Sequence, residues 1–234
     1  MTGTLYGVGV GPGDPELMTL KAHRLIRSAP VIAYPAPDSG NSFARAIAAE
    51  AISAGAEEIP MIVPMHAARF PAQEVYADAA TQIALHLEAG RDVVCLCEGD
   101  PFFFGSFMYL HRRLAERFPV EVVPGVSSLG ACAAALGRPL TARNDVLTVL
   151  PGPLPDTELR AGIKAAEAIA IMKVGRHLGR IRALIGAMGL MASSGYVARA
   201  SLGDQTVLPL SEAPATAPYF SMILIYKGGD PWLT

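Results

Sequence analysis

Apolar runs of strand length alternate along the chain with segments whose apolar residues recur at helical spacing. In the first half, such runs predict strands at residues 5–10, 30–34, 58–63, 92–97 and 120–123. Helical patterns lie between them, at residues 15–25, 42–54, 72–89 and 107–118. The clearest helical stripe is formed by Val75, Ala79, Ile83 and Leu87. Strands that alternate with helices in this way predict an α/β fold with a mainly parallel sheet.

The second half is richer in strands and has shorter turns. A short helix begins at residue 127, and the predicted strands that follow are residues 146–150, 168–174, 195–200, 206–210 and 219–227. Helices are predicted at residues 156–166 and 177–190. This pattern predicts a mixed sheet. The predicted joint lies at residues 136–141, which divides the chain into an N-terminal α/β domain of residues 1–134 and a C-terminal α/β domain of residues 135–234.

The first strand ends in a glycine-rich turn. Gly9, Gly11 and Gly13 can adopt positive φ without the steric cost of a Cβ atom. Asp14 fits the N-cap of the helix that follows, and Pro15 fits its first position. The turn therefore lies at the carboxyl end of a strand, where open α/β sheets bind ligands.

A dinucleotide-binding fingerprint fails at this turn because its spacing is wrong. A Gly-x-Gly-x-x-Gly pattern that starts at Gly7 places Pro12 at the third glycine, and one that starts at Gly9 places Asp14 there. A carboxylate at the start of the helix is also poorly suited to a pyrophosphate. A tight turn without a ligand remains an alternative, but two further turns of the same kind follow.

Two more strands end in glycine-containing turns, at residues 98–106 and 124–128. The first of these carries Glu98-Gly-Asp-Pro-Phe-Phe-Phe-Gly, and the second carries Pro124-Gly-Val-Ser-Ser. Together with the first turn, Gly9-Val-Gly-Pro-Gly-Asp, this ordered set resembles the tetrapyrrole (corrin and porphyrin) methylase family. The resemblance runs from residue 4 to about residue 228. It implies two αβα domains with the active-site cleft between them.

The resemblance also implies a cofactor. Members of the family transfer a methyl group from S-adenosylmethionine, which becomes S-adenosylhomocysteine, to a tetrapyrrole. Carried over motif by motif, the cofactor-binding positions are Pro12, Glu98, Gly99, Asp100, Phe103, Ser127, Ser128, Met172, Ala200, Ser221 and Met222. Several of these residues also have a structural interpretation: Asp100 and Ser127 as helix caps, and Met172 as a core residue.

One departure from the family pattern narrows the substrate. Uroporphyrinogen methylases carry an acidic residue after the second strand, whereas this chain has Tyr34-Pro35-Ala36 there. The stretch resembles the branch that methylates the C20 meso carbon of precorrin-2 to give precorrin-3A, with cobalt-containing factor II as the alternative substrate. Asp14 and Tyr34 are the candidates for handling the C20 proton. The candidates for binding the carboxylates of the substrate are Lys21, Arg24, Arg143, Arg176 and His177.

Composition excludes several other classes of protein. The net charge of -2 argues against a nucleic-acid surface. No apolar run approaches the about 18 residues of a membrane span, and the start of the chain lacks the pattern of a signal peptide.

Cys95, Cys97 and Cys132 form no metal-binding pattern and are expected to be buried thiols in a reducing compartment. We therefore expect a cytoplasmic protein without a metal or a membrane partner, and a homodimer as in relatives.

Three alternatives remain beside this hypothesis. Diphthine synthases resemble the same family but recognise a protein, for which the sequence shows no feature. A ribosomal-RNA 2′-O-methyltransferase would need a basic surface, which the pI of 6.2 does not support. A non-enzymatic tetrapyrrole carrier would not bind S-adenosylmethionine, and the three turns argue against it.

Overall fold

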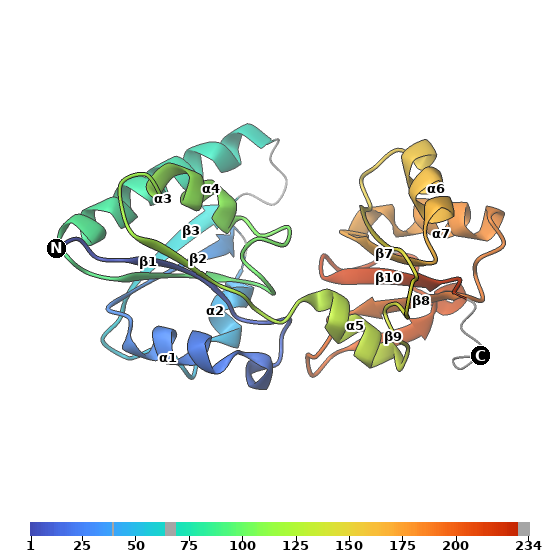
Figure 1. Cartoon of the computed structure of the whole chain (residues 1–234), viewed down its shortest axis with the longest axis horizontal. Helices are drawn as coiled ribbons and strands as arrows, with labels where there is room; N and C mark the ends of the chain where they lie inside the picture. Colours follow the sequence, from blue (N-terminus) through green and yellow to red (C-terminus); the bar gives the residue numbers. More distant parts are fainter. Residues whose placement is uncertain (39, 64–68, 229–234) are drawn as a thin grey trace. The chain divides into compact units, whose positions relative to one another are not determined.

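The structure is a computed structural model that describes residues 1–38, 40–63 and 69–228. The chain divides into two compact units, Met1–Ser127 and Ser128–Thr234, each built around its own sheet (Figure 1). The expected division at residues 134/135 would cut the helix α5 (Ser128–Leu136) near its end. The observed division lies before α5 because Cys132 and Ala133 of this helix pack on the second sheet.

The first unit contains a five-stranded sheet in the order β3-β2-β4-β1-β5. Each neighbouring pair of strands is parallel. The strands are β1 (Leu5–Gly9), β2 (Val31–Pro37), β3 (Glu57–Val63), β4 (Val93–Cys97) and β5 (Val120–Val123). This order places β4 and β5 on either side of β1, so the turns that follow these three strands lie along one edge of the sheet.

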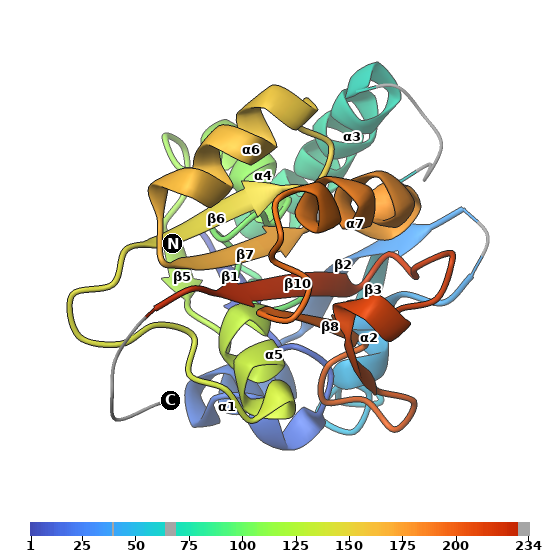
Figure 2. The same cartoon turned by 90° about the vertical axis from the view of Figure 1, so that its right-hand side faces the viewer.

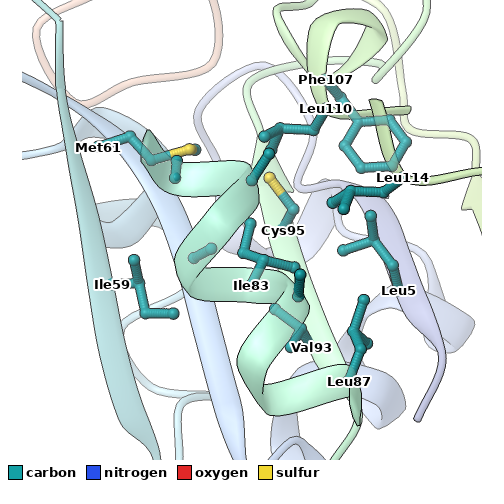
Figure 3. Packing of buried hydrophobic residues seen from close by; sticks show 14 of the residues in the cluster. Leu5, Ile59, Met61, Ile83, Leu87, Val93, Cys95, Phe107, Leu110 and Leu114 are labelled. Carbon is teal, nitrogen blue, oxygen red and sulfur yellow. The ribbon is translucent and has the colours of Figure 1, made fainter. Parts of the chain in front are cut away.

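Helices cover both faces of the first sheet. Helices α3 (Arg69–Glu88) and α4 (Phe107–Leu114) pack on one face, where Ile83, Leu87, Leu110 and Leu114 enclose the central strands (Figure 3). Helices α1 (Leu20–Ser28) and α2 (Phe43–Ile47) pack on the other face. The helical stripe predicted for residues 72–89 is confirmed, because Ala79, Ile83 and Leu87 are buried in this core.

The second unit contains a five-stranded mixed sheet in the order β6-β7-β10-β8-β9. Its strands are β6 (Leu147–Pro151), β7 (Ala168–Met172), β8 (Ser194–Ala198), β9 (Thr206–Pro209) and β10 (Ser221–Tyr226). Helices α6 (Asp156–Ala165) and α7 (Leu178–Ala187) cover one face, and α5 covers the other (Figure 2). The described residues also form single-turn 3₁₀ helices: η1 (Pro15–Leu17), η2 (Gly175–His177) and η3 (Leu210–Glu212).

The α/β class, with one parallel and one mixed sheet, is confirmed. Two helix predictions are wrong in detail. The first helix is interrupted, because Met18 and Thr19 are extended and the Thr19 side chain caps a new helix by accepting the N–H of Ala22. The helix predicted for residues 42–54 ends at Ile47, where turns replace helical hydrogen bonding.

Two further expectations concern the cysteines and membrane-spanning helices. All three cysteines are free and buried, and Cys95 and Cys97 face the same core, as expected. Among the described residues, no helix combines the length and the apolar character that crossing a bilayer requires. The expected cleft between the two domains stays a prediction.

Candidate functional site

The turns after β1 and β4 are joined by backbone hydrogen bonds. The N–H of Gly99 donates to the carbonyl of Gly11 at 2.8 Å, and the N–H of Gly11 donates to the carbonyl of Gly99 at 3.3 Å. Gly11 has a φ of +83° and Gly99 has a φ of +63°, both in the left-handed region that favours glycine. The first and second sequence motifs therefore form one continuous surface at the carboxyl edge of the sheet.

The third turn packs against the other two without intervening side chains. A Cβ atom on Gly125 would lie 2.0 Å from the carbonyl oxygen of Gly99 and 2.8 Å from the Cα atom of Gly9. A Cβ atom on Gly9 would lie 2.5 Å from the same carbonyl oxygen. These positions exclude any larger residue, so the contact among the three turns is built from bare backbone.

Asp100 ties the second turn to the third. Its Oδ1 accepts the N–H of Phe102 at 2.9 Å, and its Oδ2 accepts the N–H of Gly125 at 3.1 Å. The first bond closes a turn rather than capping a helix, because the next helix begins only at Phe107, so the predicted helix cap at Asp100 is wrong. The second joins segments far apart in the chain, so this carboxylate orders two of the three turns.

Glu98 lies at the end of β4 and faces α2. Val94 and Leu96 face the core under α1 and α2, and alternation along the strand places Glu98 on the same face. Burial raises the pKa of the Glu98 carboxyl, while its own N–H and the N–H of Ala44 oppose that shift. The site thus contains a half-buried carboxyl group.

The remaining predicted residues of the first unit surround these turns. Pro12 is half-buried, and Asp14 accepts the N–H of Glu16 at 2.9 Å as the N-cap of η1. Phe103 is half-buried between the exposed Phe102 and Phe104. Ser127 directly precedes α5, and Ser128 is its first residue.

Tyr34 lies in the interior of the first unit. Its side chain is 8% exposed and packs in the core under α1 and α2. Burial raises the pKa of Tyr34, and Glu58 adds to this effect while Arg45 opposes it. Arg45 in turn donates two hydrogen bonds to Glu58, at 2.6 and 2.8 Å.

The second unit gathers its predicted residues at the edge where β6, β7 and β8 end and β10 begins. β10 is antiparallel to both β7 and β8, so Ser221 pairs with Ala198 beside the end of β7 at Met172. Met172, Ala200 and Met222 belong to the cluster under α5. Ser221 points to the opposite face, because it alternates with Met222, and its hydroxyl donates to the carbonyl of Pro218 at 2.8 Å.

The basic candidates come from both units. Lys21 is paired with Glu121, and Arg24 is exposed on α1. Arg143 is exposed and has φ of +44°. Arg176 and His177 are in contact, with 3.4 Å between Nε and Nε2. Burial, Arg176 and Arg180 lower the pKa of His177 from its ordinary value of 6.5.

Residues 4–214 match the sequence model of the Tetrapyrrole (Corrin/Porphyrin) Methylases. The chain belongs to this family. The three turns at the carboxyl edge of the first sheet are the motifs that carried the resemblance, and the family assignment from the sequence is confirmed.

Curated methylase relatives cover nearly the whole chain. The cobalamin biosynthesis protein CobIJ of Mycobacterium tuberculosis is 44% identical over 97% of the chain, which spans only 46% of that relative's length. The precorrin-2 C(20)-methyltransferase of a Sinorhizobium species is 41% identical over 95% of each protein. The cobalt-precorrin-2 C(20)-methyltransferase of Salmonella typhimurium is 31% identical over 97% of the chain and 98% of the relative.

Solved methylase structures share the fold. The uroporphyrin-III C-methyltransferase of Thermus thermophilus, complexed with S-adenosylhomocysteine, aligns with a TM-score of 0.67 at 29% identity, over 95% of this chain and 97% of that one. The cobalt precorrin-4 methyltransferase CbiF aligns with a TM-score of 0.72 at 25% identity, over 95% of this chain and 94% of that one.

Sequence reasoning missed Gly125 as a member of the site. The Pro-Gly pair of the third motif was the available signal, but only the sheet order shows that this glycine packs against Gly9 and Gly99.

Proposed function

We propose that this chain methylates C20 of precorrin-2 with S-adenosylmethionine. The observation that carries the proposal is the 41% identity, over 95% of both proteins, to a relative named for that reaction. The contacts among the three turns at the edge of the first sheet also support it, because we would not expect them in a chain that had kept the fold but lost the site.

The chemistry of the turns fits a cationic cofactor. Residues 9–14, 98–106 and 124–128 contain Asp14, Glu98 and Asp100 but no lysine or arginine. Their carboxylates and backbone carbonyls suit a sulfonium and an ammonium group, and would repel a pyrophosphate. The positions proposed to hold the cofactor are Pro12, Glu98, Gly99, Asp100, Phe103, Ser127, Ser128, Met172, Ala200, Ser221 and Met222.

The protein has to position the reactants rather than activate them. When bound, S-adenosylmethionine supplies an electrophilic methyl group, and the enamine-like C20 carbon is already a nucleophile. Transfer forms the bond from C20 to the methyl carbon, breaks the sulfur–methyl bond and releases the C20 proton. The bare backbone of the three turns would fix the approach and exclude water.

Asp14 is the better placed of the two candidates for taking the C20 proton. Its carboxyl lies on the first turn and is half-buried, whereas the Tyr34 hydroxyl lies in the core with a raised pKa. A phenol with a raised pKa stays protonated near neutral pH and is a weak base.

Basic groups would bind the carboxylates of the substrate. Arg176 and His177 are in contact near the end of β7, on the same unit as Met172. We propose them as the main carboxylate ligands, with Lys21, Arg24 and Arg143 as further candidates. Lys21 is already paired with Glu121, so a substrate carboxylate would have to compete with that ion pair.

The cobalt-containing substrate is the second candidate. The relative from Salmonella typhimurium is named for cobalt-precorrin-2, at 31% identity over nearly the whole chain. The deciding experiment incubates the protein and S-adenosylmethionine with precorrin-2, with and without cobalt. Mass spectrometry and NMR of a labelled methyl group then locate the product.

A single methyl at C20 of the metal-free substrate supports the proposal. Transfer only with cobalt replaces it with the second candidate. Cofactor binding without methylation of either tetrapyrrole overturns the substrate assignment.

We also propose a homodimer, which light scattering of the purified chain would test.

A further inference from the structure

The hydroxyl group of Tyr196 is an unusual polar group in the second unit. Tyr196 lies on β8, is 0% exposed and packs against the core under α6 and α7. Among the described residues, its hydroxyl is a buried side-chain group without a hydrogen-bond partner. A buried, unsatisfied hydroxyl destabilises a protein, and native structures contain few such groups.

Ser221 is the polar side chain placed to satisfy this hydroxyl. Tyr196 pairs with Ile223 across the sheet, so Ser221 is its diagonal neighbour on the same face of β10. Burial raises the pKa of Tyr196, and Ser221 and Arg199 oppose that shift.

The two hydroxyls have complementary hydrogen-bonding capacity. Ser221 uses its single proton to bond the carbonyl of Pro218, at 2.8 Å. Its oxygen can therefore only accept a further bond, and the Tyr196 hydroxyl has a proton to donate. A small displacement of the segment 218–221 would complete a chain from Tyr196 through Ser221 to Pro218.

That segment forms part of the edge proposed to bind the cofactor. The N–H of Arg199 donates to the carbonyl of Phe220 at 2.8 Å, which ties the start of β10 to the end of β8 beside Ala200. Arg199 and Ser201 both have positive φ, so the backbone here is held in a sparsely populated conformation.

We propose that Tyr196 is a positioning residue whose hydroxyl bonds Ser221 when S-adenosylmethionine occupies this edge. Binding of the cofactor displaces segment 218–221 slightly, and the new hydrogen bond from Tyr196 holds it there. The inference rests on the proposed function and adds a residue that contacts the cofactor only through Ser221.

The test combines Tyr196→Phe, Ser221→Ala and the double variant, with thermal unfolding and calorimetric titration of S-adenosylhomocysteine. Without ligand, Y196F should be at least as stable as the wild type, because it removes an unsatisfied group. It should bind the ligand about three- to tenfold more weakly, the effect of one hydrogen bond. The double variant should bind no more weakly than the weaker single variant.

Tyr226→Phe is the matched control. The Tyr226 hydroxyl donates to Asp145 Oδ2 at 2.9 Å, at the far end of β10. Y226F should lose stability and keep its ligand affinity. Unchanged affinity in Y196F, or a loss of stability like that of Y226F, overturns the inference alone. A wild type that does not bind the ligand overturns the proposed function and this inference together.

Discussion

Asp100 accepts a hydrogen bond from the N–H of Gly125 at 3.1 Å, between turns that follow two strands on opposite sides of β1. Asp100 and Gly125 lie far apart in the sequence, so no local sequence pattern predicts this bond. It makes one carboxylate responsible for the spacing of the proposed cofactor site, and the first two predictions depend on it.

Asp100→Asn should weaken both the fold and the cofactor site. An asparagine presents an NH₂ group to one of the two N–H donors that the carboxylate now satisfies. We expect a loss of about 1–3 kcal/mol in the free energy of unfolding, measured in urea, and weaker binding of S-adenosylhomocysteine. Wild-type values for both quantities would show that the carboxylate does not order the turns.

Gly125→Ala should separate the third turn from the second. The added Cβ atom would lie 2.0 Å from the carbonyl oxygen of Gly99, so the backbone has to move. We expect a lower Tm and weaker cofactor binding. Gly130→Ala is the matched control, because nothing lies within 4 Å of its Cβ position in α5. That change should stabilise the protein by about 0.5–1 kcal/mol. Equal effects of the two substitutions would contradict the prediction.

Asp14→Asn separates the capping role of Asp14 from its proposed catalytic role. Asparagine caps a helix as well as aspartate does, so the Tm should not change. If the carboxylate takes the C20 proton, kcat should fall about a hundredfold with little change in KM. Product formation followed by mass spectrometry gives both constants. A kcat equal to that of the wild type would leave Asp14 as a cap only.

His177 should give substrate binding a pH dependence. Its pKa lies below 6.5 in the free protein, and a substrate carboxylate beside it would raise that pKa. Binding then takes up a proton, so the KM for the tetrapyrrole should fall as the pH decreases toward 6. His177→Gln should abolish this trend and raise KM about tenfold at low pH.

The control for His177→Gln is Arg117→Gln, which removes a positive charge from an exposed ion pair with Glu88 before β5. This variant should keep both the KM and its pH trend. Affinity for S-adenosylhomocysteine should be unchanged in both variants. A pH trend that survives in H177Q would assign it to another group.

Glu58 should stabilise the first unit only above acidic pH. Arg45 lowers the pKa of Glu58 below its ordinary value of 4.5. A depressed carboxyl pKa contributes stability above 4.5, and the contribution disappears as the pH falls through the folded-state value. The Arg45 side chain is 42% exposed, so Glu58→Gln should cost only about 0.5–1 kcal/mol at pH 7.

Urea unfolding at pH 7, 5 and 3 measures this cost, which should become smaller as the pH falls below 4.5. Glu88→Gln, in the more exposed pair with Arg117, should cost little at every pH. A constant difference between E58Q and the wild type across these pH values would contradict the assigned role of the ion pair.

Local features of the site followed from the sequence. The glycines of the first two turns, the cap at Asp14 and the buried stripe of α3 depend on neighbouring residues and on steric limits that act over a few positions. The alternation of strands and helices likewise predicted the class of each sheet. The interruption before Leu20 escaped prediction because apolar spacing continues through the extended residues Met18 and Thr19.

The fold class, the family and the three turns could be predicted from the sequence, because short-range backbone preferences and ordered motifs specify them. The contacts among the turns could not be predicted in this way. Gly9, Gly99 and Gly125 meet because β4 and β5 both pair with β1, and pairing between distant strands depends on the packing of the whole sheet. The same long-range packing placed Tyr34 in the core under α1 and α2.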